Sequence, residues 1–334
     1  MKNVKTLLIL LSISTFIFAS ATRTDALGGA RFWADDYANI GAFPASVNNH
    51  NVAWTDGSDF TSVWNSDGTT WGFAGGTGDD MANIMWGNGS MGVAVGLSNT
   101  PEDTDAGTDA DLGLNIGFGM PLAGMDFGFT YGMGGDNYGG GDVGVNLRRA
   151  QNIWLFENIL VGFGMGMEDT DTGEPATMGL GVDLYKNTAY DSGINSLFAL
   201  GFNYNDTGVE GVDPGMGIEW NFAVESAMTD WATLRIGYSH GYDFANGGTD
   251  MDAVDAVEAV ACTDTTDMTC AEYVAGSPAV SQVNGFVVGL GFNYGSFNLD
   301  MNVGGYDNLF NNPVQYVTGR NESLGANWTI SYNW

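Results

Sequence analysis

From about Ser90 to the C-terminus, large apolar residues alternate with small or polar residues. In residues 112–120, for example, Leu112, Ile116 and Phe118 fall on one face, while Gly113 and Asn115 fall on the other. Side chains alternate between the two faces of a β-strand, so a period of two predicts strands with one apolar face. The same period recurs in residues 125–131, 159–167, 178–184, 216–224, 286–294, 297–303 and 328–334.

The composition of the two faces separates a membrane barrel from a soluble β-sandwich. A sandwich packs large residues on its inner face and places charges outside. Here the apolar face is uniformly large, and the other face consists mainly of Gly, Asn and Thr with isolated charges. Most runs also have roughly the 9–11 residues that a tilted strand needs to cross a bilayer. The pattern therefore favours a transmembrane antiparallel β-barrel, with lipid outside and a polar lumen inside.

Aromatic residues lie near the ends of the predicted strands, as in the interfacial girdles of outer-membrane barrels. The chain also ends on an amphipathic strand with Trp334 as its last residue, which resembles the C-terminal assembly signal of bacterial outer-membrane barrels. Both features support an outer-membrane location. The girdle candidates are Tyr131, Trp220, Trp231, Tyr238, Tyr294, Trp328 and Trp334.

The connections between strands give an independent test, because barrels of this class alternate short periplasmic turns with longer external loops. If the C-terminus is periplasmic, residues 295–296 form a periplasmic turn, whereas residues 243–281 and 307–324 form external loops. Nearly every long acidic connection then falls on the external side. We expect about fourteen strands, within a range of twelve to sixteen, because the apolar pieces between residues 52 and 86 are short.

The N-terminus predicts export. Lys2 and Lys5 precede an apolar stretch at residues 6–18, and small residues at 19–21 suit a signal peptidase. The apolar stretch is shorter than the ~20 residues of a spanning helix, which disfavours a membrane anchor. We therefore expect a signal peptide at residues 1–21, a separate segment at residues 22–50, and the barrel at residues 51–334.

Charge and composition narrow the functional classes. The 334 residues include 40 Asp and Glu against 9 Lys and Arg, a formal net charge of −31. So few basic residues exclude nucleic acid as a partner, since phosphate binding needs clustered Lys and Arg. Cys262 and Cys270 lie close together in one polar segment, and an oxidising compartment predicts a disulfide between them.

Residues 26–45 suggest a family. Ala26-Leu27-Gly28-Gly29-Ala30, an Ala-Asp-Asp triplet at residues 34–36, and Pro44-Ala45 resemble the start of the outer-membrane fatty-acid-transporter superfamily, including its PorV-like branch. Phe43 departs from that pattern, since the family usually has Asn before the Pro-Ala pair. The resemblance implies a fourteen-stranded barrel with an N-terminal hatch in its lumen, and binding of a hydrophobic ligand.

The residue types of this segment suit a hatch. Gly28 and Gly29 permit positive φ or a close backbone approach, Pro44 interrupts regular structure, and Asp35 and Asp36 can bond to lumenal groups. A disordered leader or a periplasmic tail is the alternative.

Charged residues on the non-apolar face are the candidate lumenal site. Glu219 and Arg235 flank a turn almost symmetrically, which predicts an ion pair between them, with structural neutralisation as its simplest role. Arg148, Arg149 and Arg235 are the cations that could meet a carboxylate, but three arginines among many acids make a poor anion funnel. A neutral hydrophobic solute or a cation fits this lumen better than a free fatty acid. The inward candidates are Asp126, Arg148, Asp183, Glu219, Arg235 and Asp300.

Closely spaced carboxylates in two external loops are candidate Ca²⁺ ligands, although neither loop has the spacing of an EF-hand. A solvated acidic surface is the favoured explanation for them. These residues are Asp103, Asp105, Asp169 and Asp171. Apart from such ions we expect no cofactor.

No catalytic motif stands out around His50 or His240, so we expect a protein that is not an enzyme. The sequence predicts an outer-membrane channel for a small hydrophobic molecule, in contact with outer-membrane lipid and lipopolysaccharide. A cation-preferring porin without a hatch is the first alternative. A structural or surface-interaction protein with ion-binding loops is the second.

Overall fold

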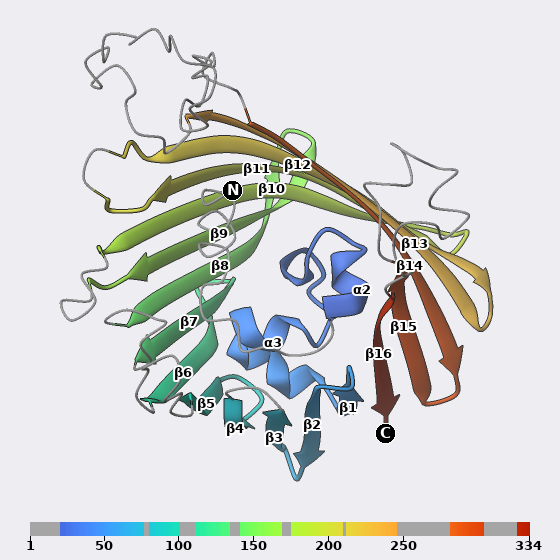
Figure 1. Cartoon of the computed structure of the whole chain (residues 1–334). Helices are drawn as coiled ribbons and strands as arrows, with labels where there is room; N and C mark the ends of the chain where they lie inside the picture. The colour runs from blue at the N-terminus through green and yellow to red at the C-terminus, as the bar shows by residue number, and fades with distance from the viewer. Residues whose placement is uncertain are drawn as a thin grey trace, which may run out of the picture.

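The computed structural model describes residues 21–76, 80–100, 111–133, 141–168, 175–209, 212–245, 281–303 and 326–334. Its strands form one closed antiparallel barrel in which sequence neighbours pair and β1 closes the ring against β16 (Figure 1). The strands are β1 Val52–Thr55, β2 Asp59–Ser66, β3 Thr69–Gly76, β4 Asp80–Gly87, β5 Gly92–Thr100, β6 Asp111–Leu122, β7 Met125–Met133, β8 Asp142–Ile153, β9 Phe156–Gly166, β10 Thr177–Tyr190, β11 Ile194–Asp206, β12 Gly215–Thr229, β13 Ala232–Ala245, β14 Ser281–Tyr294, β15 Phe297–Val303 and β16 Ala326–Asn333.

All the runs that the period of two predicted are strands, but the predicted number was wrong. The barrel has sixteen strands rather than fourteen, because all four short pieces from Val52 to Gly87 belong to it. Their alternation is hard to see because both faces carry apolar residues. Phe60 and Phe73 are exposed on the outer face, while Val52, Trp54 and Val63 are buried on the inner face.

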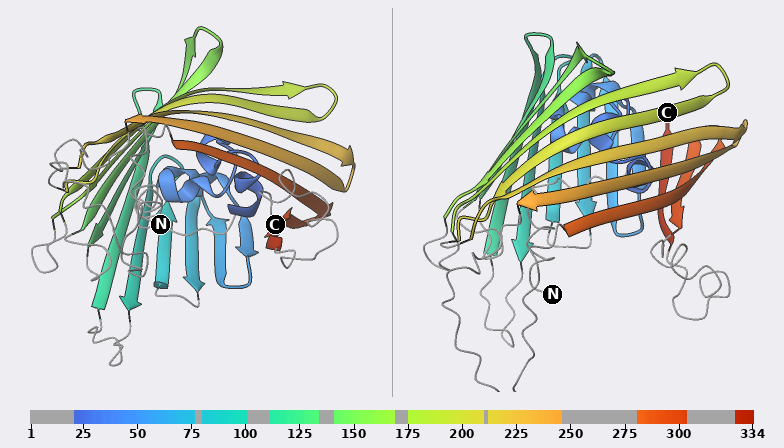
Figure 2. Two further views of the ribbon diagram at one scale, coloured as in Figure 1. Left: turned by 45° about the horizontal axis from the view of Figure 1, so that its top comes forward. Right: turned by 90° about the horizontal axis from the view of Figure 1, so that it is seen from above.

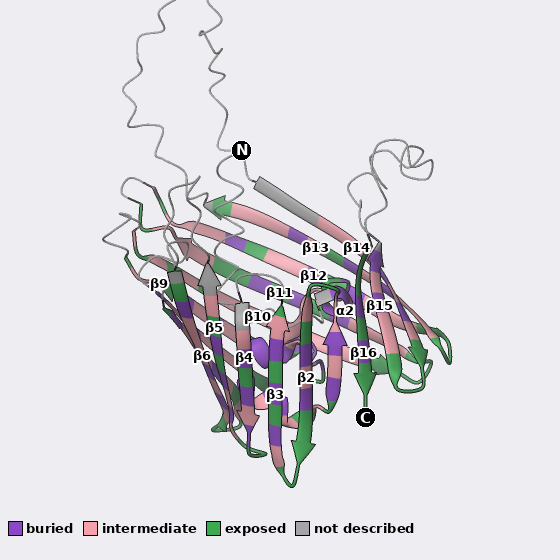
Figure 3. Cartoon of the chain, turned by 60° about the horizontal axis from the view of Figure 1, so that its bottom comes forward, coloured by how far each residue is buried: buried purple, intermediate pink, exposed green. Residues whose placement is uncertain are grey.

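The strand ends form two rims (Figure 3). One rim, here called the short-turn rim, holds the turns at residues 67–68, 88–91, 123–124, 154–155, 191–193, 230–231 and 295–296. The C-terminus lies at this rim, since the Asn333 amide donates to the Ser296 carbonyl at 2.9 Å. The strand ends that the longer connections join lie at the opposite rim. The short turns and the longer connections are therefore divided between the two rims as the sequence predicted.

Residues 21–50, here called the N-terminal segment, lie inside the ring of strands, as two views show (Figures 1 and 2). The segment contains α2 Ala21–Asp25, η1 Ala30–Phe32, α3 Asn39–Ala42 and η2 Pro44–Asn49, and leads directly into β1. Gly28 (φ 82°) and Gly29 (φ 114°) adopt the positive φ that was expected of them. No helix in the described residues is long and apolar enough to cross a membrane.

Two apolar clusters join the segment to the wall. Ile40 and Val47 pack against the inner faces of β1–β5, and Leu27, Phe32, Trp33 and Phe43 pack against β9–β12. The two clusters therefore form where the N-terminal segment meets the inner wall.

Candidate functional site

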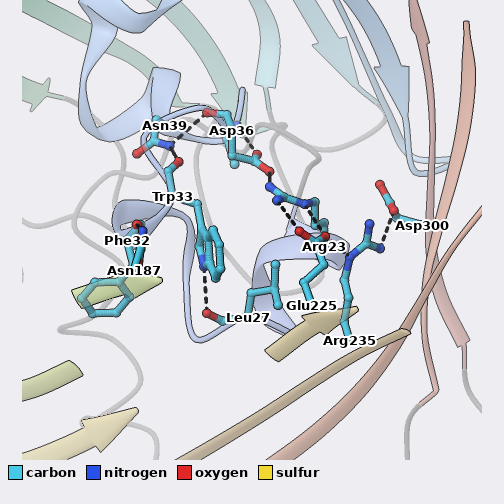
Figure 4. Close-up of polar contacts among 11 residues, drawn as sticks. Arg23, Leu27, Phe32, Trp33, Asp36, Asn39, Asn187, Glu225, Arg235 and Asp300 are labelled. Atoms are coloured by element: carbon cyan, nitrogen blue, oxygen red, sulfur yellow. Dashed lines mark hydrogen bonds and ion pairs between the residues drawn. The ribbon is translucent and has the colours of Figure 1, made fainter. Parts of the chain in front are cut away.

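Arg23 in α2 connects the N-terminal segment to the barrel wall (Figure 4). Its Nε and Nη2 atoms donate to the two carboxylate oxygens of Glu225 on β12, at 3.2 and 3.1 Å. Its Nη1 atom pairs with Asp36, which lies later in the same segment. Burial opposes the charge of Arg23, but the carboxylates of Asp36 and Glu225 raise its pKa above the ordinary value. Arg23 therefore stays charged and bridges two carboxylates.

The chain of ion pairs continues across the wall. Arg235 on β13 donates to Glu225 at 2.8 Å and to Asp300 on β15 at 2.6 Å. The side chains of Glu225, Arg235 and Asp300 are only 12%, 8% and 11% exposed. Breaking a buried pair by removing one partner costs several kcal/mol, because the other charge is then left uncompensated. This network is the strongest polar attachment of the segment among the described residues.

Arg148 on β8 makes a second attachment. Its Nε and Nη2 atoms donate to Asp126 on β7 at 3.0 and 2.9 Å. Its Nη1 atom donates to the Arg31 carbonyl at 3.1 Å and to the Asn39 side chain at 3.0 Å. The guanidinium also lies 4.4 Å from the centre of the Phe43 ring. One side chain of the wall thus holds three points of the segment.

Inward-facing glycines let the segment approach the wall. A Cβ atom at Gly128 would overlap the Ala42 carbonyl, and one at Gly92 would overlap the Pro44 carbonyl. A Cβ atom at Gly119 would lie 2.5 Å from the Ala45 nitrogen, and one at Gly237 would lie 2.5 Å from the Ala26 carbonyl. These distances are too short for any side chain. The inner surface of the wall therefore matches the path of the segment.

Arg31 points away from these networks. Its guanidinium lies near Gly162 and within electrostatic reach of Asp183 and Glu219 on the inner wall. Among the described residues, no ion pair within 4.0 Å involves Arg31, Asp183 or Glu219. Two carboxylates lie near one guanidinium here, so this part of the lumen has a net negative charge.

A cavity of about 270 Å³ lies between the segment and the wall, near the short-turn rim. Arg148 and Asp126 line one side of it, and Ser46 and Asn48 line the other. The Ser46 side chain is buried, and its hydroxyl has no hydrogen-bond partner among the described residues. The cavity is large enough for a small solute or several waters.

The structure brings together most of the predicted inward residues, but it corrects one pairing. Glu219 does not pair with Arg235, because the register places Glu219 opposite Gly241 and Glu225 opposite Arg235. The turn lies at residues 230–231 rather than 226–230, so β12 continues to Thr229 and brings Glu225 opposite Arg235. A bulge between Ala227 and Thr229 shifts the register by only one residue.

Two further residues differ from expectation. Arg149, a candidate lumenal cation, follows the inward-facing Arg148 and is exposed on the outer wall. Of the acidic pair, Asp36 is buried and bonded to Arg23, whereas Asp35 is exposed.

The sequence analysis missed Arg23, Arg31 and Asn39. Both arginines lie in the segment that was expected to enter the lumen, so their position carried the signal. The sequence analysis did not predict them because it placed the lumenal cations on the strands alone.

Several predictions fall outside the described residues. These are the signal peptide up to residue 20, the disulfide between Cys262 and Cys270, and the candidate Ca²⁺ ligands Asp103, Asp105, Asp169 and Asp171. Within the described residues, no group of three or more His, Cys, Asp or Glu side chains is arranged to hold a metal ion.

The sequence matches no protein-family model and no curated protein. Among solved structures, a bacterial polysaccharide outer membrane secretin has a TM-score of 0.49 at 10% identity, covering 85% of this chain and 99% of that chain. A mutant of the Rh. blastica porin has a TM-score of 0.37 at 10% identity, covering 83% and 89%. The translocator domain of the autotransporter NalP from Neisseria meningitidis has a TM-score of 0.25 at 12% identity, covering 85% and 84%.

At these scores the likenesses carry no argument about function. The assignment of this chain to the closed antiparallel barrels depends on its own strand pairing. The resemblance to the fatty-acid-transporter superfamily stays an expectation from the sequence.

Proposed function

We propose that this chain is an outer-membrane channel whose passage is closed at rest by the N-terminal segment. The observation that carries the proposal is the fit of the segment to the inner wall, with glycines at the close approaches, an ion pair to β12 and hydrogen bonds from Arg148 on β8. A leader with no role inside the barrel would need neither feature. The proposed role is not enzymatic.

Membrane insertion is supported by the outer wall. Large apolar side chains are exposed along successive strands, such as Phe198, Leu200 and Phe202 on β11. A continuous exposed apolar surface of this kind is unusual on a soluble monomer. Aromatic side chains are exposed at the short-turn rim, including Trp231, Tyr294 and Trp334, as at a membrane interface.

The two halves of the segment are held differently, which suggests how the passage opens. Residues 39–50 pack mainly on β1–β5, accept a hydrogen bond from Arg148 at Asn39, and are tied to β1 by the chain itself. Residues 21–36 depend on the Arg23 network as well as on apolar contacts. We infer that the first half moves, because its ion pairs can be exchanged for water or for a solute.

The more specific proposal is that the channel carries a small hydrophobic solute. It follows from the resemblance to the fatty-acid-transporter superfamily. A specific observation favours the cation-preferring channel as a second candidate, namely the inward carboxylates Asp183 and Glu219 with Arg31 as their nearest cation. Bilayer recordings with different salt concentrations on the two sides distinguish the candidates. A reversal potential that favours cations supports the second candidate, and uptake of an apolar dye without ion selectivity supports the first.

A reversible cross-link tests the closed state. The side-chain oxygens of Thr22 and Thr329 lie 2.8 Å apart, so cysteines at both positions can form a disulfide with little movement. Cys262 and Cys270 are first replaced by Ser. We expect the oxidised pair to abolish channel openings in planar bilayers and reduction to restore them, with each single cysteine as the control. Equal conductance before and after reduction would contradict the proposal.

A further inference from the structure

The described residues contain six basic side chains, and four of them face the interior. Arg23 and Arg31 belong to the N-terminal segment, and Arg148 and Arg235 contact that segment or its partners. The other two, Arg149 and Lys186, follow inward-facing residues on β8 and β10 and therefore point outward. They are the only described cations on the outer wall of a chain with a net charge of −31.

These two cations flank β9 on its two sides, at positions two residues apart along that strand. Arg149 pairs in register with Ile159, and Tyr185, the neighbour of Lys186, pairs with Asn158. Both therefore lie close to the short-turn rim, near the turns at residues 154–155 and 191–193.

One of the cations is already paired. Lys186 Nζ lies 2.5 Å from Glu157 Oε1, and the two side chains are 40% and 49% exposed. Arg149 is exposed and forms no ion pair with any residue of the described ranges. Arg149, Lys186 and Glu157 together therefore carry a net charge of one positive unit.

The adjoining turn carries a strained aromatic residue. Trp154 has a φ of 54°, a conformation that is uncommon for a bulky side chain. The other non-glycine residues with positive φ are Asp67 and Ala123, each followed by a glycine in a tight turn. Trp154 is 87% exposed. Tryptophan favours the boundary between acyl chains and headgroups.

We propose that Arg149, Lys186 and Trp154 form a binding site for the phosphodiester headgroup of a glycerophospholipid in the leaflet at the short-turn rim. The site rests on the proposed placement in a membrane. The Arg149 guanidinium offers two parallel N–H groups that match phosphate oxygens, and Lys186 adds a third donor. Glu157 offsets the charge of Lys186, so the patch balances a single phosphate. The indole packs on the glycerol and the upper acyl chain.

Lipid retention measured by native mass spectrometry tests the site. The full chain is purified in detergent and mixed with phosphatidylglycerol, or with diacylglycerol of the same acyl chains. Loss of a charge-assisted contact pair is expected to weaken binding about tenfold. We therefore expect the R149Q/K186Q variant to retain about tenfold less phosphatidylglycerol than the unaltered chain, with diacylglycerol unchanged. R149K should retain an intermediate amount, because it keeps the charge and loses the planar fork.

Two controls isolate the headgroup. Trp231 is exposed at the next-but-one turn of the same rim, and the nearest described basic residue in sequence, Arg235, is buried and faces the interior, so W231A should leave phosphatidylglycerol retention unchanged. Inorganic phosphate at the same concentration should not displace the lipid, since it lacks the apolar contacts with Trp154. Displacement by phosphate alone would show an anion site rather than a lipid site, and would overturn the proposal.

Equal retention by R149Q/K186Q and the unaltered chain, or equal retention of the two lipids, would also overturn it. Strand content by circular dichroism verifies that each variant is folded. Insertion into phosphatidylcholine vesicles is measured separately. A chain that inserts but shows no preference for phosphatidylglycerol contradicts the site alone, whereas a chain that does not insert contradicts the proposed membrane channel.

Discussion

Glu225 holds two arginines, one in the N-terminal segment and one in the wall. Replacement with Gln removes the charge and keeps the size, so Arg23 and Arg235 lose their shared partner. We expect the Glu225→Gln variant to lose about 2–3 kcal/mol of unfolding free energy, because two buried guanidinium groups lose charge-assisted hydrogen bonds while keeping Asp36 and Asp300 as partners. Denaturant titration measures the loss.

Glu219 provides the matched control, because it lies on the same strand and faces the same interior without an ion pair among the described residues. Glu219→Gln should change stability by less than about 1 kcal/mol. Similar losses in the two variants would show that the Arg23 network does not hold the segment.

A second residue-scale prediction concerns Gly128, where a Cβ atom would overlap the Ala42 carbonyl. Gly128→Ala should shift α3 from the wall and cost about 1–3 kcal/mol, as overpacking does. Gly181 is also an inward-facing glycine, but a Cβ atom there would meet nothing within 4 Å. Gly181→Ala should therefore leave stability nearly unchanged. The melting temperatures of the two variants compare a glycine that touches the N-terminal segment with one that faces open space.

At the scale of the element, α2 carries both the main ion pair and a titratable carboxyl. Asp25 reaches lumenal water, yet the protein surrounds it closely enough that burial raises its pKa to about 6. An acid with a raised pKa in the folded state favours the protonated form, so the docked helix should gain stability as the pH falls from about 6 toward the ordinary value of 3.8. Above pH 6 the charged carboxyl costs stability.

Asp25→Asn removes that cost. We expect the variant to be more stable than the unaltered chain at pH 7.5, with the difference shrinking as the pH falls to about 4. Melting temperatures at several pH values measure it. A difference that stays constant with pH would contradict the assigned role of Asp25.

The short strands β1–β4 show why element prediction was incomplete. Their inner faces pack against the N-terminal segment, so Val52, Trp54 and Val63 are apolar where other strands carry Gly or polar residues. A sequence pattern that assumes one polar face cannot recognise such strands. The long strands carry mainly Gly or polar residues on their inner faces, so their apolar positions keep a clear period of two.

At the scale of the whole molecule, the two rims predict an orientation. Ser58 is exposed in the connection between β1 and β2, and Asp191 is exposed in the turn between β10 and β11 at the short-turn rim. With Cys262 and Cys270 replaced by Ser, a membrane-impermeant maleimide should label Ser58→Cys on intact cells. Asp191→Cys should be labelled only after the outer membrane is permeabilised. The reverse labelling pattern would show that the barrel has the opposite orientation in the membrane.

The sequence by itself determined the class of fold, the long strands, the sorting of the rims and the inward position of most charged residues. These properties depend on local alternation and on connection length, which are written along the chain. Tertiary structure decided the count of sixteen strands, the partner of Arg235, and the attachment of the N-terminal segment to the wall through Arg23 and Arg148. Those features depend on the register between strands and on contacts between residues up to 307 positions apart, which no local pattern encodes.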